Sequence, residues 1–493
     1  MTEADLSVPF RRRARSAMQD AFLQEALTIA TNKFIGLRRE AFDDFPEGER
    51  LRDRAREIKE ATLQHLDRHL EQLCDNVERL GGTVHFAATP EEARAIILDI
   101  ARRTGARMAV KSKSMATEEI DLNEALERAG VTPVETDLGE YIIQLAHERP
   151  SHIIAPAIHK TRGQVADLFA RELGRQVAAD PEVLTKIARA ELREKFLQAD
   201  LGITGANFAV ADTGTVVLVT NEGNGRMVTA LPRVHVAVMG VEKVVPSMTD
   251  LMVFLAILAK SATGQKLSVY TTLVRGPRRA GELEGPDEFH LVLLDNGRIA
   301  QLAGPLREAL YCLRCGACLN VCPVYRQIGG HAYGYTYPGP IGILLTAMLN
   351  GPASVKELAH ASSLCGACAD ACPVRIDIPR MLIALRREVD ERKIAPWPER
   401  VAFKALAAVL ARPRLYRWGA AVARLLQRPF AHGGAIRSLP LALGAWTRTR
   451  DLPAVAARTF QERWKDLERE QRSRAAPGAD HPRSEPDSRL PRQ

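Results

Sequence analysis

The segment at residues 312–323 reads Cys312-Leu-Arg-Cys315-Gly-Ala-Cys318-Leu-Asn-Val-Cys322-Pro323. A second segment, offset by 50 residues, reads Ser362-Ser-Leu-Cys365-Gly-Ala-Cys368-Ala-Asp-Ala-Cys372-Pro373. The pattern C-x2-C-x2-C-x3-C-P is typical of bacterial ferredoxins, where closely spaced thiolates and one more distant thiolate hold a cubane iron-sulfur cluster. These two cysteine blocks therefore predict a protein that carries electrons.

The spacing within each block suits a cluster site. Gly316 and Gly366 let the backbone curl tightly between the cysteines without a Cβ penalty, and the prolines that end the blocks turn the chain away. In two-cluster ferredoxins the fourth cysteine of one block binds the cluster of the other block. By this rule, one [4Fe-4S] site consists of Cys312, Cys315, Cys318 and Cys372.

The second predicted site has one ligand fewer. It comprises Cys322, Cys365 and Cys368, and Ser362 stands where the first block has Cys312. Three arrangements are open: Ser362 binds iron through its oxygen, the cluster keeps an open iron, or the centre is a [3Fe-4S] cluster.

Zinc and disulfide bonds are the alternatives for these cysteines. Structural zinc usually takes four ligands in two separated pairs, which fits three closely spaced cysteines poorly. The chain starts with the polar stretch Met1-Thr-Glu-Ala-Asp and lacks the apolar stretch of a signal peptide, which predicts a cytoplasmic, reducing location without disulfides. The remaining cysteine, Cys74, lies in a helical pattern and is most simply a small buried apolar residue.

Composition and charge narrow the class of protein. The 493 residues are 46% hydrophobic and 26% charged, which is an ordinary globular balance. Apolar runs such as the one beginning at Leu251 fall well short of the roughly 18 to 20 residues of a membrane span. The net charge of +8 is modest for this length and the arginines are dispersed, which argues against nucleic-acid binding. A basic surface equally suits an acidic redox partner.

Hydrophobic spacing predicts two kinds of structure before the cysteine blocks. Residues 10–80 carry apolar side chains at helical spacing, with a break at residues 43–48. From about residue 82, short apolar strands alternate with amphipathic helices, which predicts an α/β domain with a largely parallel sheet. The predicted strands begin at Val84, Met108, Pro133 and Ile153, and further apolar runs at Phe208, Thr215 and Val234 predict neighbouring strands of the same domain.

Polar residues near the ends of these strands are candidates for a ligand site, because α/β folds bind ligands there. The loop 221–226 has the composition of an anion cradle with Arg226 as a carboxylate clamp, although a hairpin turn explains it equally well. Each further candidate, taken singly, is more simply explained by a structural role than by a catalytic one. His235 is expected to be a core histidine. The further candidates are Lys111, Lys113, Glu140, Asp212, Thr213, His235, Glu242 and Lys243.

The region after the cysteine blocks is rich in arginine and predicts amphipathic helices near residues 401–410 and 420–426. Their apolar faces fit core packing, docking of a partner or peripheral contact with a membrane surface, and we favour the first two because the basic residues form no continuous face. Residues 470–493 are almost devoid of apolar side chains and predict a disordered tail.

Several longer phrases resemble the lactate utilization protein B family. They lie at residues 202–215, 221–226, 231–235, 240–243 and 285–290, followed by the two cysteine blocks, and the likeness extends from about residue 15 to 470. The resemblance implies an N-terminal α/β lactate-utilization domain related in fold to the sugar-phosphate isomerase and CoA-transferase group, then a two-cluster ferredoxin module and a helical C-terminal domain. Members carry seven cysteines in this pattern, so Ser362 departs from two-cluster ferredoxins but not from this family, and two [4Fe-4S] clusters are favoured.

The resemblance also implies a function. It points to an iron-sulfur subunit in the oxidation of L-lactate to pyruvate, acting with a cysteine-rich-repeat protein and a smaller lactate-utilization-domain protein. The 42 residues between Cys322 and Cys365 suggest a helical ferredoxin module like that of succinate dehydrogenase iron-sulfur subunits. The expected division is a helical segment at 1–80, an α/β domain at 81–300, a ferredoxin-type domain at 301–385, a helical domain at 386–469 and a tail at 470–493.

Three hypotheses remain open for the chain as a whole. It is an electron-transfer subunit whose α/β domain only binds a ligand or partner, or that domain is itself catalytic in hydroxy-acid oxidation, or the clusters are structural in a scaffold. The absence of a flavin or nicotinamide fingerprint favours the first, since oxidation of a hydroxy acid normally needs a hydride acceptor.

Overall fold

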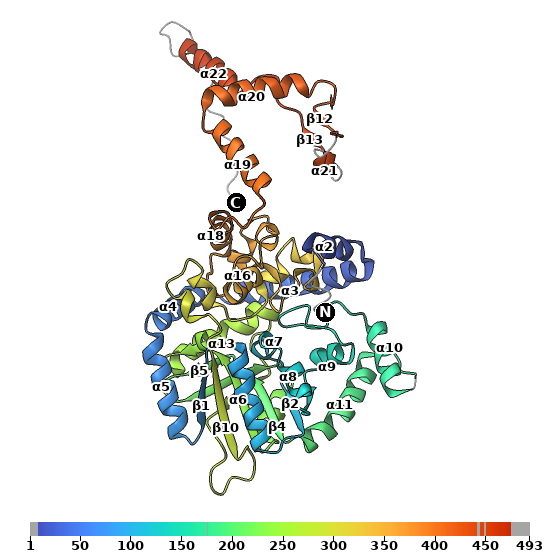
Figure 1. Cartoon of the computed structure of the whole chain (residues 1–493), viewed down its shortest axis with the longest axis vertical. Coiled ribbons are helices and arrows are strands. Elements are labelled where there is room, and N and C mark those ends of the chain that lie inside the picture. The colour runs from blue at the N-terminus through green and yellow to red at the C-terminus, as the bar shows by residue number, and fades with distance from the viewer. Residues whose placement is uncertain (1–7, 175, 441–443, 448–449, 475–493) are drawn as a thin grey trace, which may run out of the picture. The chain divides into compact units, whose positions relative to one another are not determined.

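A six-stranded parallel sheet forms the centre of the computed structural model, with strand order β1-β10-β7-β4-β2-β3 (Figure 1). The structure describes residues 8–174, 176–440, 444–447 and 450–474. All seven residues of β7 are buried, as expected for a central strand of a sheet covered on both faces. The predicted α/β fold with a parallel sheet is confirmed. The strands are β1 (Thr83–Ala87), β2 (Met108–Lys111), β3 (Thr132–Glu135), β4 (Leu201–Gly205), β7 (Val234–Gly240) and β10 (Glu288–Leu294).

Helices connect these parallel strands, and local sequence explains where they begin. The helix α6 starts after Thr89, whose hydroxyl accepts a hydrogen bond from the amide of Glu92 at 3.2 Å, and it has Pro90 in its first turn. The connecting helices are α6 (Pro90–Arg103), α7 (Met115–Glu119), α8 (Leu122–Arg128), α9 (Leu138–Leu145), α10 (Arg162–Leu173), α11 (Pro181–Gln198), α12 (Asn224–Ala230) and α13 (Met248–Thr263).

A second, four-stranded sheet has the order β8-β5-β6-β9. Its strands are β5 (Phe208–Val210), β6 (Thr215–Thr220), β8 (Val244–Val245) and β9 (Tyr270–Val274). The prediction that the runs at Phe208, Thr215 and Val234 are neighbours is right for β5 and β6, which pair antiparallel, and wrong for β7, which lies in the parallel sheet.

The predicted strand at Ile153 is also wrong. The ring nitrogen Nδ1 of His152 accepts hydrogen bonds from the amides of Ile154 and Ala155, at 3.1 and 3.2 Å, which holds this segment in a bend.

Within the described chain, four helices precede the parallel sheet, as the apolar spacing of residues 10–80 predicts. They share one hydrophobic core with the small sheet and the cysteine region, since Leu27 and Ile58 belong to the same buried cluster as Phe208 and Tyr325. The whole stretch up to Ile394 forms one compact unit. The helices are α2 (Phe10–Gln19), α3 (Ala21–Asp43), α4 (Gly48–Gln64) and α5 (Leu66–Arg79), and the predicted break falls between α3 and α4.

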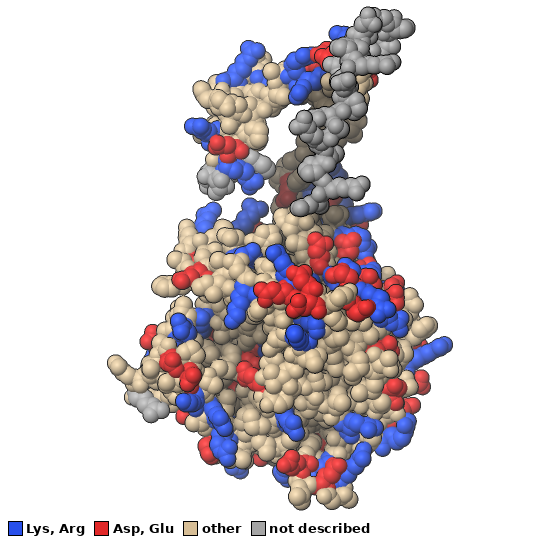
Figure 2. Space-filling view, turned by 180° about the vertical axis from the view of Figure 1, so that it is seen from behind, with Lys and Arg blue, Asp and Glu red and all other residues tan. Residues whose placement is uncertain are grey.

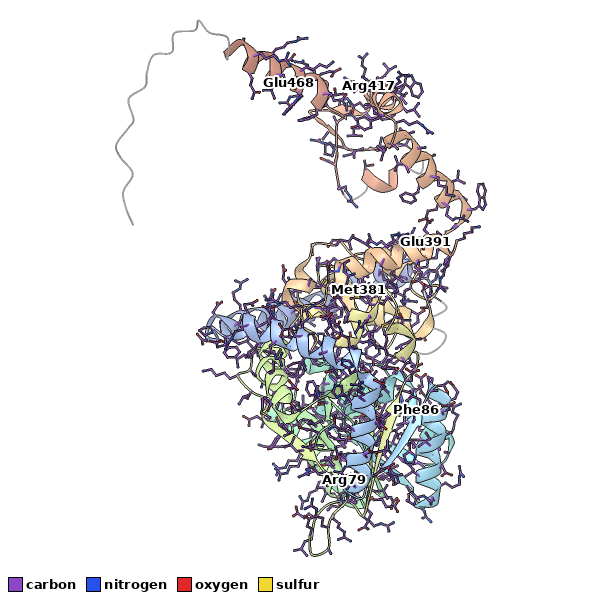
Figure 3. All side chains as sticks on the ribbon, turned by 90° about the vertical axis from the view of Figure 1, so that its left-hand side faces the viewer. Arg79, Phe86, Met381, Glu391, Arg417 and Glu468 are labelled. Carbon is purple, nitrogen blue, oxygen red and sulfur yellow. The ribbon has the colours of Figure 1, made fainter. Side chains whose placement is uncertain are left out.

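The cysteine region is built of short helical segments and one buried helix, α16 (Gly339–Asn350), in which ten residues are buried. The helix α18 (Ile378–Glu391) closes this region, and Figure 3 labels its buried residue Met381. The shorter segments are η3 (Arg307–Tyr311), α14 (Ala317–Asn320), α15 (Tyr325–Ile328), η4 (His331–Tyr333), η5 (Leu358–His360) and α17 (Ala367–Ala371). The predicted helical character of the ferredoxin module is therefore present.

A second compact unit starts at Ala395. Its helices α19 (Trp397–Leu410) and α20 (Pro413–Leu426) pack against each other, and within the described chain neither buries a residue. Large apolar side chains are exposed on both, among them Trp397 at 73% and Trp418 at 70%. The unit also contains β11 (Ala431–His432), β12 (Ala435–Ile436), α21 (Gly444–Thr447), β13 (Leu452–Pro453) and α22 (Phe460–Arg474). Most of the predicted disordered tail, residues 475–493, lies outside the described residues.

Acidic and basic side chains are interspersed on the face drawn in Figure 2. On this face the distribution agrees with the dispersed arginines of the sequence. Among the helices that the structure describes, none is both long and apolar enough to cross a membrane.

Candidate functional site

The two cysteine blocks adopt the same backbone conformation. Gly316 and Gly366 have φ values of 75° and 88°, in the left-handed region that favours glycine. Arg314 and Leu364, two residues earlier in each block, are also left-handed, with φ values of 61° and 55°. Each block therefore forms a tight curl that places its cysteines on one side of the turn.

The thiols gather into two groups, each with members from both blocks. Burial, together with the thiols of Cys312 and Cys372, raises the pKa of Cys315 to about 12. Burial, together with the thiols of Cys322 and Cys365, raises the pKa of Cys368 to about 12. The last cysteine of each block therefore lies beside cysteines of the other block.

Cys318 lies where the two groups meet. Burial raises its pKa well above the usual range, and its neighbouring thiols come from both groups: Cys312, Cys315, Cys368 and Cys372. The two groups are therefore adjacent.

The two groups differ in their access to solvent. Cys312, Cys315, Cys318 and Cys372 are all buried, whereas Cys365 of the other group is exposed. The amide of Ala367 and the hydroxyl of Ser363 lower the pKa of the exposed Cys365 thiol. One group therefore faces the interior and the other reaches the surface.

Basic side chains surround the buried group. Lys243 donates a hydrogen bond to the carbonyl oxygen of Cys312 at 2.9 Å, and Arg52 donates to that of Cys372 at 2.9 Å. Burial lowers the pKa of Lys243 to about 7, and a smaller contribution from Arg314 acts in the same direction. Burial also lowers the pKa of Lys59 to about 8, although Glu242 and Cys312 oppose this shift.

A chain of buried ion pairs connects this group to the parallel sheet. Arg298 lies 2.7 Å from carboxylate oxygens of both Glu242 and Glu119. Glu242 also lies 3.3 Å from Arg314, whose guanidinium is 4.8 Å from the centre of the Tyr337 ring. The Tyr337 hydroxyl donates to Glu119 at 2.7 Å. Burial raises the pKa of Glu242, but Arg298 and Arg314 outweigh it and lower the pKa to about 2.

These residues fit iron-sulfur clusters. Burial and the neighbouring thiols raise the pKa of Cys315 and Cys318, so these two need a metal to become thiolates, and thiolates are the ligands that such clusters take. A cubane held by four thiolates is an anion, and Lys59, Lys243 and Arg314 supply buried positive charge beside the first group. Seven cysteines are in place, and Ser362 lies at the eighth position of the repeat.

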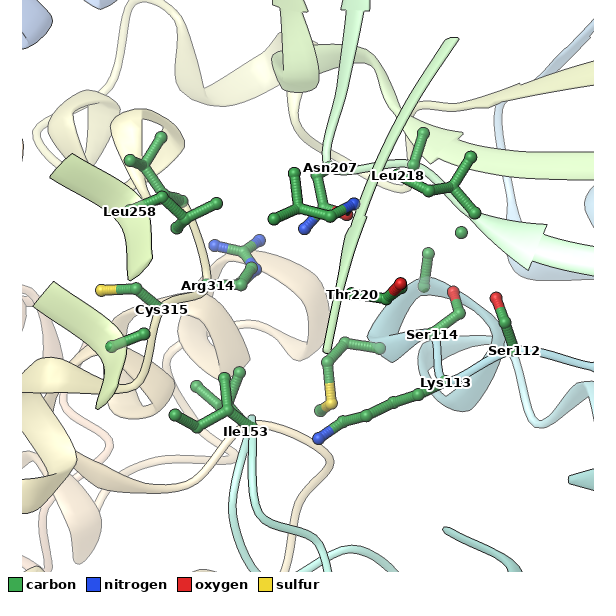
Figure 4. Close-up of a pocket in the computed structure, with 18 of the residues that line it drawn as sticks. Ser112, Lys113, Ser114, Ile153, Asn207, Leu218, Thr220, Leu258, Arg314 and Cys315 are labelled. Atoms are coloured by element: carbon green, nitrogen blue, oxygen red, sulfur yellow. Dashed lines mark hydrogen bonds between the residues drawn. The ribbon is translucent and has the colours of Figure 1, made fainter. Parts of the chain in front are cut away.

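A cavity of about 350 Å³ lies between the buried cysteine group and the carboxyl ends of the parallel strands (Figure 4). Residues that follow β2, β4 and β7 line it, and Arg314 and Cys315 form part of the opposite wall. The carboxyl ends of parallel strands are the usual ligand site of α/β sheets. The polar lining includes Ser112, Lys113, Ser114, Asn207, Thr220 and Asn224.

Of the sequence candidates, the structure brings Lys113, Glu242 and Lys243 into this lining. Glu140 is buried beside Lys113, and burial raises the pKa of its carboxyl well above the usual range. Lys111 instead forms a buried ion pair with Glu135 at 2.5 Å, which is a structural role.

The other candidates lie elsewhere. His235 is buried, hydrogen-bonded to the hydroxyl of Thr204 at 2.8 Å, and packs in the core as expected. Asp212 and Thr213 are outside the cavity lining. Arg226 is exposed in α12 and also outside the lining, so its suggested role as a carboxylate clamp is wrong, because the segment continues into a helix that turns this side chain to solvent.

Sequence reasoning missed Arg298, Arg314 and Tyr337. Arg314 stands between two cysteines of the first block, and this position was a usable signal. Arg298 and Tyr337 follow β10 and η4 with no distinguishing pattern, and only the fold brings them to Glu119.

Glu148, His159 and His331 form a different cluster, with side-chain ligand atoms within 4.8 Å of one another. The carboxylate of Glu148 already pairs with His159 and with Lys160, each at 2.6 Å, and His331 hydrogen-bonds to the carbonyl of Arg149 at 2.7 Å. Ion pairs and hydrogen bonds within the protein therefore account for this cluster. The remaining cysteine, Cys74, is half-buried and packs against the core.

Three family models match successive parts of the chain. The LUD domain matches residues 70–294, the 4Fe-4S dicluster domain matches residues 308–376, and the C-terminal domain of lactate utilisation protein B matches residues 388–469. Both cysteine blocks lie within the second match, which agrees with the iron-sulfur chemistry of the two thiol groups.

Curated relatives extend over almost the whole chain. Lactate utilization protein B of Shouchella clausii is 47% identical over 94% of this chain and 98% of its own length. The proteins of the same name from Bacillus licheniformis and Exiguobacterium sp. are 46% and 48% identical over 94% and 93% of this chain, and 97% and 98% of their own. A crystal structure of a DUF162 family protein from Deinococcus radiodurans aligns over 98% of that chain and 46% of this one, with 14% identity and a TM-score of 0.26. The identities and the full-length coverage are decisive: this chain belongs to the lactate utilization protein B family.

Proposed function

We propose that this chain is an electron-transfer component in the oxidation of L-lactate to pyruvate. The observation that carries the proposal is the pair of adjacent thiol groups at different depths, one buried beside a cavity and the other reaching the surface at Cys365. Such an arrangement suits the passage of electrons between an interior site and a partner. The names of the relatives favour lactate as the source of the electrons.

We propose the following cluster ligands. Cys312, Cys315, Cys318 and Cys372 hold one [4Fe-4S] cluster, and the second is held by Cys322, Cys365 and Cys368. The neighbouring relations among the thiols support this division. The fourth position of the second cluster is taken by the oxygen of Ser362 or stays open, and a [3Fe-4S] centre remains the alternative. When bound, these clusters supply one-electron transfer.

The protein's own residues would position and shield these clusters. Arg52 and Lys243 anchor the backbone at Cys372 and Cys312 through hydrogen bonds to their carbonyl oxygens. The amide of Arg314 donates to the sulfur of Cys312 at 3.3 Å, a contact of the kind that stabilises a thiolate. Buried cations and sulfur hydrogen bonds both favour the reduced, more negative state of a cluster.

The family resemblance supplies the proposed partners, and the polar N-terminal stretch supplies the proposed location. We propose that the chain works in the cytoplasm with a cysteine-rich-repeat protein and a smaller lactate-utilization-domain protein. The exposed group at Cys365 supports electron exchange with such a partner. The proposed kinship of the α/β domain with the isomerase and CoA-transferase group is supported only by its helix-flanked parallel sheet.

A second candidate function is that the α/β domain takes part in hydroxy-acid oxidation itself. The cavity favours it, because it adjoins Cys315 and lies where α/β sheets bind ligands. The chain would then bind the acid directly and would not depend on a partner for this step.

The test is anaerobic purification followed by electron paramagnetic resonance, with L-lactate added first to the chain alone and then with its partners. Cluster reduction that requires the partners supports the electron-transfer function. Reduction of the clusters by lactate without partners would replace it with the catalytic alternative. Clusters that stay redox-inert in both mixtures would show that they are structural.

A further inference from the structure

We infer that the cavity between the parallel sheet and the buried cysteine group binds a small organic carboxylate, with Lys113 as its principal anchor. The redox role of this ligand rests on the proposed function. The binding of the ligand rests on the cavity alone. The ligand site adjoins the buried cysteine group at Cys315, and its anchor directly follows β2 of the parallel sheet.

The cavity has the position and the size of a small-molecule site. Its volume of about 350 Å³ lies in the range of small-molecule sites, and it adjoins the carboxyl ends of β2, β4 and β7. Ser112, Lys113 and Ser114 directly follow β2. Gly205 is the last residue of β4, and Ala206 follows it. The ends of these strands therefore build much of this space, and the loop residues Asn221, Glu222, Gln265 and Ser268 complete its lining.

Within the described structure, Lys113 places an unpartnered nitrogen in this cavity. Its ammonium is buried and has no hydrogen-bond partner among the described residues. Figure 4 shows the side chain extending along the cavity toward Ile153. A buried ammonium without a partner is costly to a protein unless a ligand supplies the missing acceptor. A carboxylate is the simplest organic group that supplies both the acceptor and the opposite charge.

Arg314, which also lines the cavity, carries a second free donor. The Nη1 nitrogen of Arg314 is buried and likewise has no hydrogen-bond partner within the described chain, whereas its Nη2 nitrogen lies 3.3 Å from Glu242. Arg314 is adjacent to Cys315 in sequence, and both line the wall that faces Lys113 (Figure 4). A ligand anchored at Lys113 therefore lies in the same space as a cysteine of the buried group.

The cavity lining also carries negative charge. It contains the acidic residues Asp137, Glu222 and Glu242, and each is already engaged. Asp137 accepts the amides of Gly139 and Glu140 at the start of α9, at 3.1 and 3.2 Å.

The other two acids are engaged as well. Glu222 accepts the amide of Leu138 at 3.4 Å, and Glu242 pairs with Arg298 and Arg314. Burial lowers the pKa of Lys113, and Glu140, Asp137, Glu222 and Glu118 oppose that shift and favour the ammonium, but none of the four is a hydrogen-bond partner of its nitrogen among the described residues. The Lys113 ammonium can therefore still bind an incoming anion.

The lining has a polar and an apolar part. Ser112, Ser114 and Thr220 add hydroxyl groups to the lining, and Leu218, Leu258 and Ile153 give it an apolar side. Hydroxyl groups pair with a hydroxyl or oxo group next to a carboxylate, and the apolar side suits a short carbon chain. The chemical class is therefore a short hydroxy or oxo acid.

The test measures binding of L-lactate and of pyruvate to the anaerobic, cluster-loaded chain by isothermal titration calorimetry, with L-lactamide as a neutral analogue of the same shape. We expect saturable binding of at least one acid and binding of the amide weaker by about tenfold or more, because the amide lacks the charge. Equal binding of acid and amide, or no saturable binding of either acid, would overturn the inference.

Variants locate the site. Lys113→Met should weaken binding of the acid by about tenfold or more at unchanged iron content, while Lys186→Met, at an exposed position of α11, should leave it unchanged. Ala206→Leu adds bulk to the lining while leaving Lys113 in the sequence, and it should also weaken binding, which keeps the test valid if Lys113→Met fails to fold. Undiminished binding by Ala206→Leu and by any folded Lys113→Met protein would refute the assignment.

The outcomes separate this site from the proposed function. Binding of the acid to a chain whose clusters stay inert with all partners present would uphold the site and reject electron transfer. Cluster reduction with partners, but no binding by this chain alone, would reject the site and uphold the function.

Discussion

Ser362 occupies in the second cysteine block the position that Cys312 occupies in the first, and the two side chains accept the same hydrogen bond. The Ser362 hydroxyl accepts the amide of Leu364 at 3.2 Å, and the Cys312 sulfur accepts the amide of Arg314 at 3.3 Å. The repeat therefore preserves the conformation of a ligand position where the thiol itself is absent.

This equivalence predicts the behaviour of two serine variants. Ser362→Ala should leave iron content nearly unchanged, because three thiolates remain for the second cluster. Ser362→Cys should supply a fourth thiolate in the right conformation and change the paramagnetic resonance of that cluster alone. Iron analysis and spectra of the anaerobically purified proteins decide this, and loss of iron in the alanine variant would show that the serine oxygen is a required ligand.

The crossed grouping of the thiols makes a prediction about single cysteine variants. Cys372→Ala should remove the buried cluster and Cys368→Ala the cluster at the surface, although both residues belong to the second block. Each variant should lose roughly half of the iron. The two spectra that remain should differ from each other. Identical spectra from the two variants would mean that each block holds its own cluster.

The sequence predicts the elements of this fold better than it predicts how they meet. The alternation of strands and helices and the cysteine spacing are local patterns, and the parallel sheet and the helical cysteine region agree with them. The strand expected at Ile153 fails because one side chain, His152, captures two backbone amides and bends the segment. Apolar composition alone cannot report such a contact.

The cavity could not be predicted from the sequence either, because it also depends on long-range contacts. Lys113, Glu242 and Lys243 each lie near the end of a strand, so the sequence marks them as candidates but does not say which of them face one another. Arg226 carries the same signal and lies outside the cavity. The order of strands in the sheet, which depends on long-range packing, decides which of these ends form one wall.

Lys243 should tune the reduction potential of the buried cluster. Its ammonium donates to the carbonyl oxygen of Cys312, and Lys243→Met removes this buried positive charge with little change in side-chain volume. The reduced cluster carries one more negative charge, so the variant should have a more negative midpoint potential, by roughly 60 mV if the reduced state loses a factor of ten. Potentiometric titration followed by paramagnetic resonance measures it, with Lys186→Met as the exposed control. An unchanged or more positive potential would contradict the prediction.

His235 should make stability depend on pH. Burial, and to a smaller extent His290, lowers its pKa to about 3, against about 6.5 for an unfolded histidine. Below pH 6.5 the unfolded chain binds one more proton than the folded chain, so this contribution to stability is complete above pH 6.5 and declines as the pH falls toward 3. The decline approaches about 1.4 kcal/mol per pH unit.

Urea unfolding of the wild-type protein and of His235→Gln between pH 7.5 and 5 tests this dependence. The glutamine can keep a hydrogen bond to Thr204 but does not titrate, so the free energy of unfolding should fall less steeply with acid in the variant. His432→Gln, at an exposed position, should behave as the wild type. Parallel curves for all three proteins would show that His235 is not the titrating group.

Gly330 should be among the least replaceable residues of the cysteine region. A Cβ atom at this position would lie 1.8 Å from the carbonyl oxygen of Ser151, which also accepts the hydroxyl of Tyr325 at 2.8 Å. Gly330→Ala must therefore separate the segments at Ser151 and Gly330, at a cost of about 1–3 kcal/mol or more. Gly36→Ala, inside α3 with open space around it, should instead stabilise the protein by about 1 kcal/mol. Thermal unfolding with parallel iron analysis compares them, and equal stability of the two variants would refute the close approach of Gly330 to Ser151.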